Sequence, residues 1–370
     1  MNTDKTNEVP DTTVIVIGAG QAGLSAGYQL RRRGFVNAIT NPHADHTFII
    51  FDANPAPGGA WQHRWESLRM ETVNGIFDLP DFPKPSINLA EPARIAIPNY
   101  FTDFEKHFEL PILRPVTVFS VSNDKNQTED FIIKTSKGIW HTKAIINATG
   151  TWNNPVLPSY PGQETFQGKQ LHTKDYLTNE EFRDKKVAVV GGGISALQQL
   201  EEISQVGAVY WYTRNEPIFH DGDFRPETEG REVIRKVTED VEAGKPSRSI
   251  VSYTGLPWTP YALAAKERGV LNRRPMFTVI EPKGVREVDG NFTELDTILW
   301  ATGFRADLKH LAPLQLQNSE GGILVKDTQV LADPRIYLIG FGPSQSTVGA
   351  NRAGTAAVRS LIRYFKQNNN

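Results

Sequence analysis

The stretch VIVIGAGQAGLSAGYQL, residues 14–30, decides the fold. Its β-branched start indicates a buried strand, and the apolar residues after the glycines recur at the spacing of a helix that ends near Gly34. Gly18 makes the turn, Gly20 lets the backbone approach a pyrophosphate at the helix N-terminus, and Gly23 lets the helix pack on the strand. The stretch therefore predicts a dinucleotide-binding β-α-β unit.

The segment TFIIFDA, residues 47–53, is predicted to be the next strand of this unit. At its end stands Asp52, and a carboxylate in that place can hydrogen-bond a ribose hydroxyl. The spacing from Gly23 is longer than the ~20 residues that are typical. We attribute the excess to a loop inserted at residues 36–46.

A second unit of the same design is predicted in KKVAVVGGGISALQQLEEISQVGAVYWYTRNEP, residues 185–217. Its turn contains Gly191 and Gly193, alanine takes the place of the third glycine, and the helix begins at about Ser195. Two such units, about 170 residues apart, suggest two nucleotide-binding domains.

The second unit differs from the first at the end of its second strand. No acidic residue stands there, and Thr213-Arg214 takes its place. An arginine accommodates the 2′-phosphate that a carboxylate would repel, so this change favours NADPH, with NADH use left open by the neighbouring Asn215 and Glu216. The alternative interpretation of Arg214 is a solvated surface arginine without a role in binding.

Two similar segments enclose the second unit, AIINATG at residues 144–150 and TILWATGF at 297–304. Each reads as a buried strand that ends where a backbone can approach a cofactor closely. The cofactor-binding candidates in them are Ala148, Thr149, Gly150, Ala301, Thr302 and Gly303. We therefore predict an α/β fold with two Rossmann-like domains, in which an NAD(P)H domain at 155–302 is inserted into an FAD domain formed by 1–154 and 303–370.

Composition narrows the classes of function. The chain has 370 residues, a formal net charge of −2 and no cysteine. The near balance of acidic and basic side chains gives no indication of a nucleic-acid or anionic-membrane partner. The absence of cysteine excludes a redox-active dithiol within this chain. No apolar run approaches membrane-spanning length, so we expect a cytoplasmic protein. The histidines are scattered along the chain, so we expect no metal site. We expect a small-molecule substrate and leave a homodimer open.

The segment FQGKQLHTKDY adds a pattern of its own, Phe166-x-Gly168-x-x-x-His172-x-x-x-Tyr176. Together with GGAW, which contains Gly58, Gly59 and Trp61, with DFP at 81–83 and with ATGF at 301–304, it resembles the flavin-containing monooxygenases, relatives of the Baeyer-Villiger monooxygenases. The resemblance implies that Gly59 and Trp61 lie on the flavin side. It also implies that His172 helps to couple nicotinamide binding to the flavin site, whereas an isolated histidine here would read as a linker residue that caps a carbonyl.

The resemblance implies a reaction. NADPH reduces FAD, the reduced flavin combines with O2 as a C4a-(hydro)peroxyflavin, and one oxygen atom passes to a sulfide, an amine or a ketone. Two alternatives remain open. The first is a flavin-dependent NAD(P)H oxidase or reductase that releases H2O2 or passes electrons to another acceptor, and the second is a nucleotide-sensing module without turnover.

One stretch departs from the family pattern. In many flavin-containing monooxygenases an asparagine beside the flavin follows a stretch that resembles SLRM, residues 67–70 here. The count falls on Glu71, and Asn74 is the nearest asparagine. Either the loop brings Asn74 to the flavin, or Glu71 replaces the amide, or Glu71 is a solvent-facing loop residue. Glu71, Asn74 and His172 are the candidate catalytic residues.

Overall fold

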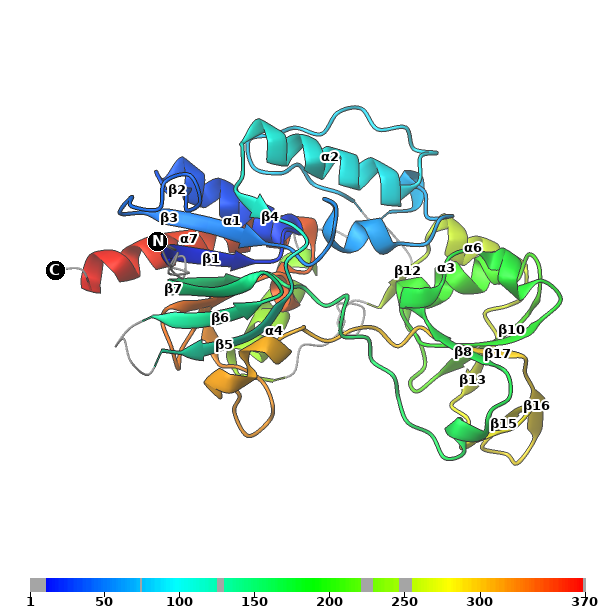
Figure 1. Cartoon of the computed structure of the whole chain (residues 1–370). Helices are drawn as coiled ribbons and strands as arrows, with labels where there is room; N and C mark the ends of the chain where they lie inside the picture. The colour runs from blue at the N-terminus through cyan, green and yellow to red at the C-terminus, as the bar shows by residue number, and fades with distance from the viewer. Residues whose placement is uncertain (1–10, 74, 125–129, 221–228, 246–254, 369–370) are drawn as a thin grey trace, which may run out of the picture.

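The fold contains two sheets with helices around them. The computed structural model describes residues 11–73, 75–124, 130–220, 229–245 and 255–368. In Figure 1 the sheet that contains β1 and the sheet that contains β10 lie side by side in separate lobes. The predicted α/β fold with two Rossmann-like domains is confirmed by this arrangement and by the full-length structural matches reported below.

The first sheet is built from both ends of the described chain. Its main path runs β18-β19-β20-β7-β1-β3-β2, with β4 on β3 and the hairpin of β5 and β6 on β7. The strands are β1 Asp11–Ile17, β2 Val36–Asn37, β3 Thr47–Phe51, β4 Ile112–Leu113, β5 Val118–Asn123, β6 Phe131–Thr135, β7 Gly138–Asn147, β18 Val325–Lys326, β19 Gln329–Val330 and β20 Ile336–Leu338. The residues after the second unit thus return to the first sheet, where β20 pairs in parallel with β7.

Both faces of this sheet are buried, which is why its central strands are almost continuously apolar. Val14 and Val16 of β1 face the cluster that includes α1 Gln21–Arg32 and α7 Thr347–Asn368. Ile15 and Ile17 alternate to the opposite face. Helix α2, Ala93–His107, packs against the segment that follows β3.

The second sheet is parallel and has the order β13-β10-β9-β17-β8. Its strands are β8 Lys169–His172, β9 Lys186–Val190, β10 Ala208–Thr213, β13 Arg273–Pro275 and β17 Thr297–Trp300. Helices α3 Ile194–Ile203 and α6 Pro260–Glu267 pack on each other at one face. A three-stranded antiparallel sheet of β14 Val279–Glu281, β15 Gly284–Arg286 and β16 Phe292–Glu294 extends this lobe.

Two features differ from the simplest reading of the sequence. The residues expected as an inserted loop at 36–46 begin with β2, which pairs in parallel with β3. Helix α4, Glu229–Glu242, belongs to the predicted inserted range, but its Val237 and Val241 pack in the apolar cluster beneath the first sheet. A segment of the insertion therefore contributes to the core of the first lobe.

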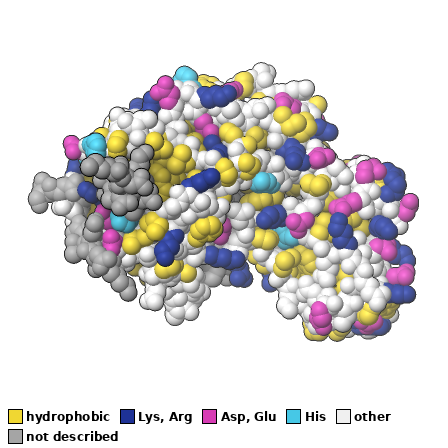
Figure 2. Space-filling view, in the orientation of Figure 1, with side chains coloured by type: hydrophobic (Ala, Val, Ile, Leu, Met, Phe, Trp, Pro, Cys, Tyr) yellow, Lys and Arg dark blue, Asp and Glu magenta, His cyan; other side chains and the backbone are white. Residues whose placement is uncertain are grey.

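The surface carries charges of both signs. Figure 2 shows Lys and Arg side chains interspersed with Asp and Glu, most densely over the lobe of the second sheet. Among the described residues, no helix is both long and apolar enough to cross a bilayer.

Candidate active site between the two glycine turns

The first glycine turn follows β1 as predicted. Gly18 has φ +101°, and a Cβ on it would lie 2.5 Å from the carbonyl oxygen of Ala148. A Cβ on Gly23 would lie 1.8 Å from the carbonyl oxygen of Gly18. Gly20, in contrast, has no heavy atom within 4 Å of that position. The first and third glycines are therefore required by the protein's own packing, while the second leaves open space at the N-terminus of α1.

Gly58 and Gly59 of GGAW are required because other parts of the chain lie very close to them. Gly58 has φ +119°, and its Cβ would lie 2.6 Å from the Cγ of Pro98 in α2. A Cβ on Gly59 would lie 2.9 Å from the Cα of Gly20. The short helix η1, Gly59–His63, is thereby held directly against the first turn, and its Trp61 lines the same cavity as the turn.

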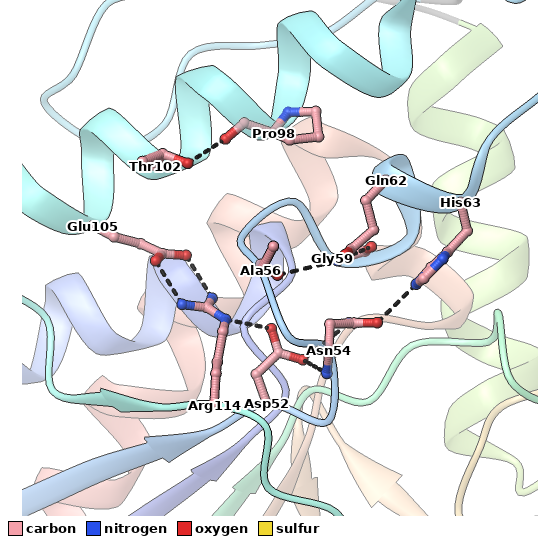
Figure 3. A network of polar contacts seen from close by, with 10 residues as sticks. All are labelled: Asp52, Asn54, Ala56, Gly59, Gln62, His63, Pro98, Thr102, Glu105 and Arg114. Carbon is pink, nitrogen blue, oxygen red and sulfur yellow. Dashed lines mark hydrogen bonds and ion pairs between the residues drawn. The ribbon is translucent and has the colours of Figure 1, made fainter. Parts of the chain in front are cut away.

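Asp52 lies at the end of β3, is buried and lines the cavity. One of its carboxylate oxygens accepts from the backbone N–H and the side-chain amide of Asn54, at 3.1 and 3.0 Å. The other pairs with Nε of Arg114 at 3.1 Å, and Arg114 also forms a two-pronged ion pair with Glu105 of α2 (Figure 3). Because this oxygen has a single described partner and two lone pairs, it retains room to accept from a ribose hydroxyl.

The second glycine turn repeats the design of the first. Gly191 has φ +150°, and a Cβ on it would lie 2.2 Å from the carbonyl oxygen of Ala301. Gly193 is the N-cap of α3 and has no heavy atom within 4 Å of a Cβ position. Ser195 lies in the first turn of α3 and lines the cavity.

The end of β10 is held by an arginine that sequence reasoning missed. Arg273 of β13 donates from Nε to Oγ1 of Thr213 at 2.9 Å and from Nη2 to the carbonyl oxygens of Thr213 and Arg214, at 3.1 and 3.4 Å. The Thr213 hydroxyl donates to the carbonyl oxygen of Asn215 at 2.7 Å, so it is already engaged. The side chain of Arg214 is exposed and lines the cavity. Arg273 reaches the end of β10 because β13 pairs with β10, and no local sequence motif predicts this contact.

Both turns open into one cavity of about 1260 Å³. All seventeen predicted cofactor-binding residues except Gly23 line it: Gly18, Gly20, Asp52, Gly59, Trp61, Ala148, Thr149, Gly150, Gly191, Gly193, Ser195, Thr213, Arg214, Ala301, Thr302 and Gly303. Gly23 lies behind the first turn, where it packs on Gly18. The structure thus brings together residues that lie far apart in the sequence.

The residues that follow the first Ala-Thr-Gly segment meet the second segment where the chain crosses between the lobes. The carbonyl oxygen of Gly303 accepts from the N–H of Val156 at 2.9 Å, and the N–H of Arg305 donates to the carbonyl oxygen of Asn154 at 2.9 Å. Thr302 donates from its hydroxyl to the carbonyl oxygen of Val156. The crossing segments therefore run as a short antiparallel pair beside the cavity.

His172 lies beneath this crossing and is only 2% exposed. Its Nδ1 accepts from the N–H of Lys174 at 3.1 Å, so the neutral ring carries its proton on Nε2, which donates to the carbonyl oxygen of Gly303 at 3.0 Å. Burial lowers the pKa of His172. Both ring nitrogens are engaged and the residue is not among those that line the cavity, so its placement is that of a linker between the lobes.

A second junction involves Tyr176, the last residue of the same pattern. Its hydroxyl donates to a carboxylate oxygen of Glu202 in α3 at 2.7 Å, and Ser67 donates to that oxygen at 2.6 Å. Trp65 donates from Nε1 to the other oxygen at 3.2 Å. Burial raises the pKa of Glu202. Sequence reasoning missed Glu202, which connects the second unit to the segment that follows η1.

The two remaining catalytic candidates are not brought to the cavity. Glu71 lies in the single turn η2, Met70–Thr72, with an exposed side chain that is not among the cavity-lining residues. This is the placement of a solvent-facing loop residue. Asn74 lies outside the described residues.

The site fits two dinucleotides. Helices α1 and α3 both begin at a glycine without a side-chain cap, so their first N–H groups are left for a ligand, and a Cβ at either glycine would fill the open space in front of them. Among the described residues, no group of three or more His, Asp or Glu side chains is placed to hold a metal ion.

Comparison with known proteins agrees with this site. The fold and the paired turns define an oxidoreductase with two dinucleotide sites, and the family model described as pyridine nucleotide-disulphide oxidoreductase matches residues 15–242. The flavin-containing monooxygenase of Stenotrophomonas maltophilia superposes with a TM-score of 0.80 at 34% identity, over 96% of this chain and 99% of that one. The chain belongs to the class B flavin monooxygenase family, whose members use FAD and NAD(P)H.

Two curated relatives extend the comparison. The oxidoreductase CzcO of Bacillus subtilis is 28% identical over 317 residues, which cover 84% of this chain and 86% of CzcO. The trimethylamine monooxygenase of Pelagibacter ubique is 30% identical over 231 residues, which cover 53% of this chain and 49% of that protein. The protein is thus an oxidoreductase of the flavin monooxygenase family.

Proposed function

We propose that the protein is an NADPH-dependent, FAD-containing monooxygenase that inserts one oxygen atom from O2 into small sulfides, amines or ketones. The observation that carries this proposal is the single cavity into which both glycine turns open. Cofactors on the two turns would share that space, so hydride could pass between them directly. The chain has no cysteine through which electrons could travel instead.

Each helix N-terminus and strand end at the cavity would bind a different part of the two cofactors. The N-terminus of α1 would hold the FAD pyrophosphate and Asp52 its ribose, while the N-terminus of α3 would hold the NADPH pyrophosphate. Arg214 would contact the 2′-phosphate, on a strand end that Arg273 fixes in place. Bound FAD supplies the redox and oxygen chemistry.

The crossing segments would fix the position of the FAD site relative to the NADPH site. Gly303 accepts hydrogen bonds from both Val156 and His172, so the strand end at Ala301–Gly303 cannot shift without breaking contacts to the first lobe's connection. We therefore propose a positioning role for His172 rather than proton transfer. The proposed domains remain 1–154 with 303–370 for FAD and 155–302 for NADPH, with α4 packed on the first sheet.

The test uses purified, FAD-loaded protein, NADPH and ¹⁸O2 with a panel of small sulfides, amines and ketones. We expect one ¹⁸O atom in the product for each NADPH consumed in at least one substrate class. Release of H2O2 in proportion to NADPH, with no labelled product across the panel, would overturn the proposal in favour of an NAD(P)H oxidase.

A further inference from the structure

Arg64 is a cavity-lining cation for which the structure describes no charged partner. It caps the C-terminal end of η1 and lines the cavity. Its Nε is buried and has no hydrogen-bond partner, and among the described residues no carboxylate forms an ion pair with its guanidinium. A guanidinium has five donors and normally does not remain unpaired when it is removed from water. Within the part of the chain that the structure describes, the Nε–H of this arginine therefore lacks a partner.

The guanidinium is held in place by aromatic rings. Its Cζ lies 5.3 Å from the ring centroid of Trp61 and 4.8 Å from that of Trp152. Trp152 is itself buried and stacks on Phe304, with centroids 5.1 Å apart and an interplanar angle of 21°. Contacts with two tryptophan faces orient the guanidinium but satisfy none of its N–H groups. The donors are thus pre-organised for a planar acceptor.

The surroundings of Arg64 favour an anion. Burial lowers the pKa of Arg64 to about 10, and no acid counteracts this effect. The pKa of the neighbouring His63 is lowered by burial and by the positive charges of Lys174 and Arg94, and the negative charge of Asp52 opposes this effect only in part. Asp52, the nearest acid along the chain that lines the cavity, is already paired with Arg114. Two positive charges and one negative charge therefore act on the residue next to Arg64.

Arg64 belongs to neither glycine turn, although its helix η1 lies against the first one. The cofactor phosphates have their own partners at the N-termini of α1 and α3 and at the end of β10. Arg64 instead lies beside Trp152, which stacks on Phe304 of a crossing segment. The substrate is the third molecule of the cavity, and neither glycine turn supplies a partner for it.

We propose that Arg64 binds a carboxylate of the substrate, so that the protein acts on sulfides, amines or ketones that carry an acidic group. A carboxylate matches the fork of a guanidinium with two parallel hydrogen bonds. The proposal rests on the proposed function for the reaction, but the binding step is independent of turnover.

The test is equilibrium binding to the FAD-loaded protein. The probes are 3-(methylthio)propanoate and the neutral 3-(methylthio)propan-1-ol, which differ in the carboxylate. We expect the wild type to bind the acid about tenfold or more tightly than the alcohol, and Arg64→Gln to lose that preference while binding the alcohol as before. Arg64→Lys, which keeps the charge and loses the fork, should be intermediate, and it decides the matter if the glutamine variant does not fold.

Arg94→Gln is the matched control. Arg94 pairs with Glu66 at 3.2 Å, acts on His63 through its charge and does not line the cavity. An equal loss of acid binding in Arg94→Gln would overturn the proposal. It would show that the acid responds to the overall positive charge near the cavity and not to a direct contact with Arg64. Equal binding of acid and alcohol by the wild type would also overturn it, as would loss of FAD or NADP⁺ affinity in Arg64→Gln with the acid preference unchanged. If the acid preference depends on Arg64 but no thioether is oxygenated, the proposed function fails and the carboxylate site stands.

Discussion

Replacing Gly20 with alanine separates cofactor binding from protein stability. Gly20 has φ −75° and ψ −177°, a backbone conformation that alanine adopts freely, and the added Cβ would meet no protein atom within 4 Å. In place of a preferred N-cap residue, alanine costs about 0.5–2 kcal/mol and glycine roughly a few tenths of a kcal/mol. Lower entropy of the unfolded chain offsets about 0.4–1 kcal/mol. The free energy of unfolding of the apoprotein should therefore change by less than about 1 kcal/mol.

Affinity for FAD should fall much further. The methyl group would occupy the open space in front of the first N–H groups of α1, where the pyrophosphate must approach. Loss of one charge-assisted hydrogen bond costs about 1.5–3 kcal/mol, which corresponds to a Kd raised about tenfold to more than a hundredfold. Titration of apoprotein with FAD measures the Kd, and thermal unfolding without FAD measures stability.

Gly193→Ala is the control, because it makes the same change at the second turn. Its backbone is also extended and its Cβ position is also empty. It should weaken NADPH binding and leave FAD affinity unchanged. Unchanged FAD affinity in Gly20→Ala, or equal FAD losses in both variants, would refute the assignment of the two turns.

Three further perturbations address the rest of the site. Arg214→Ala should raise the KM for NADPH about tenfold and leave that for NADH unchanged, because only a phosphate contact is lost; equal effects on both would remove Arg214 from phosphate recognition. Glu202→Ala should lower the free energy of unfolding in urea by about 3 kcal/mol or more, since it leaves three donors unpaired, whereas Glu202→Gln, which keeps an acceptor, should cost much less. His310 also lines the cavity, and its Nε2 lies 2.7 Å from Oδ1 of Asn147. Burial lowers the pKa of His310 to about 4, so on acidification the unfolded chain takes up this proton at a higher pH than the folded protein does, and the free energy of unfolding should fall by up to about 3 kcal/mol between pH 6.5 and 4. His310→Gln should flatten that decline, and an unchanged pH profile would contradict the argument.

The elements that sequence patterns predict well are those set by local chemistry. The glycine turns and the strands before them follow from backbone conformation and from apolar runs, and they appear where expected. Asp52 also lies at its predicted strand end despite the unusual spacing. These features depend on neighbours in the sequence.

The parts that could not be predicted depend on contacts between distant segments. Arg273 reaches the end of β10 only because β13 pairs beside it, and Glu202 gathers donors from both lobes. Glu71 is singled out by a residue count, which carries no information about side-chain direction, and its exposed side chain is not among those that line the cavity. The spacing of residues in the sequence predicts where a residue lies within a helix or strand. It does not predict which residue of another segment it will contact.

The order of strands in the first sheet has a consequence for the chain during synthesis. β20 pairs with the last residues of β7, which lie 191 positions earlier in the sequence. A ribosome-bound chain that has emerged as far as β17 can close its second sheet, yet that edge of β7 still lacks its partner. Unpaired edges of apolar strands invite pairing with other chains. The first lobe is therefore the last to be completed, and the interval before Ile336–Leu338 emerges is when the nascent protein is most exposed to aggregation.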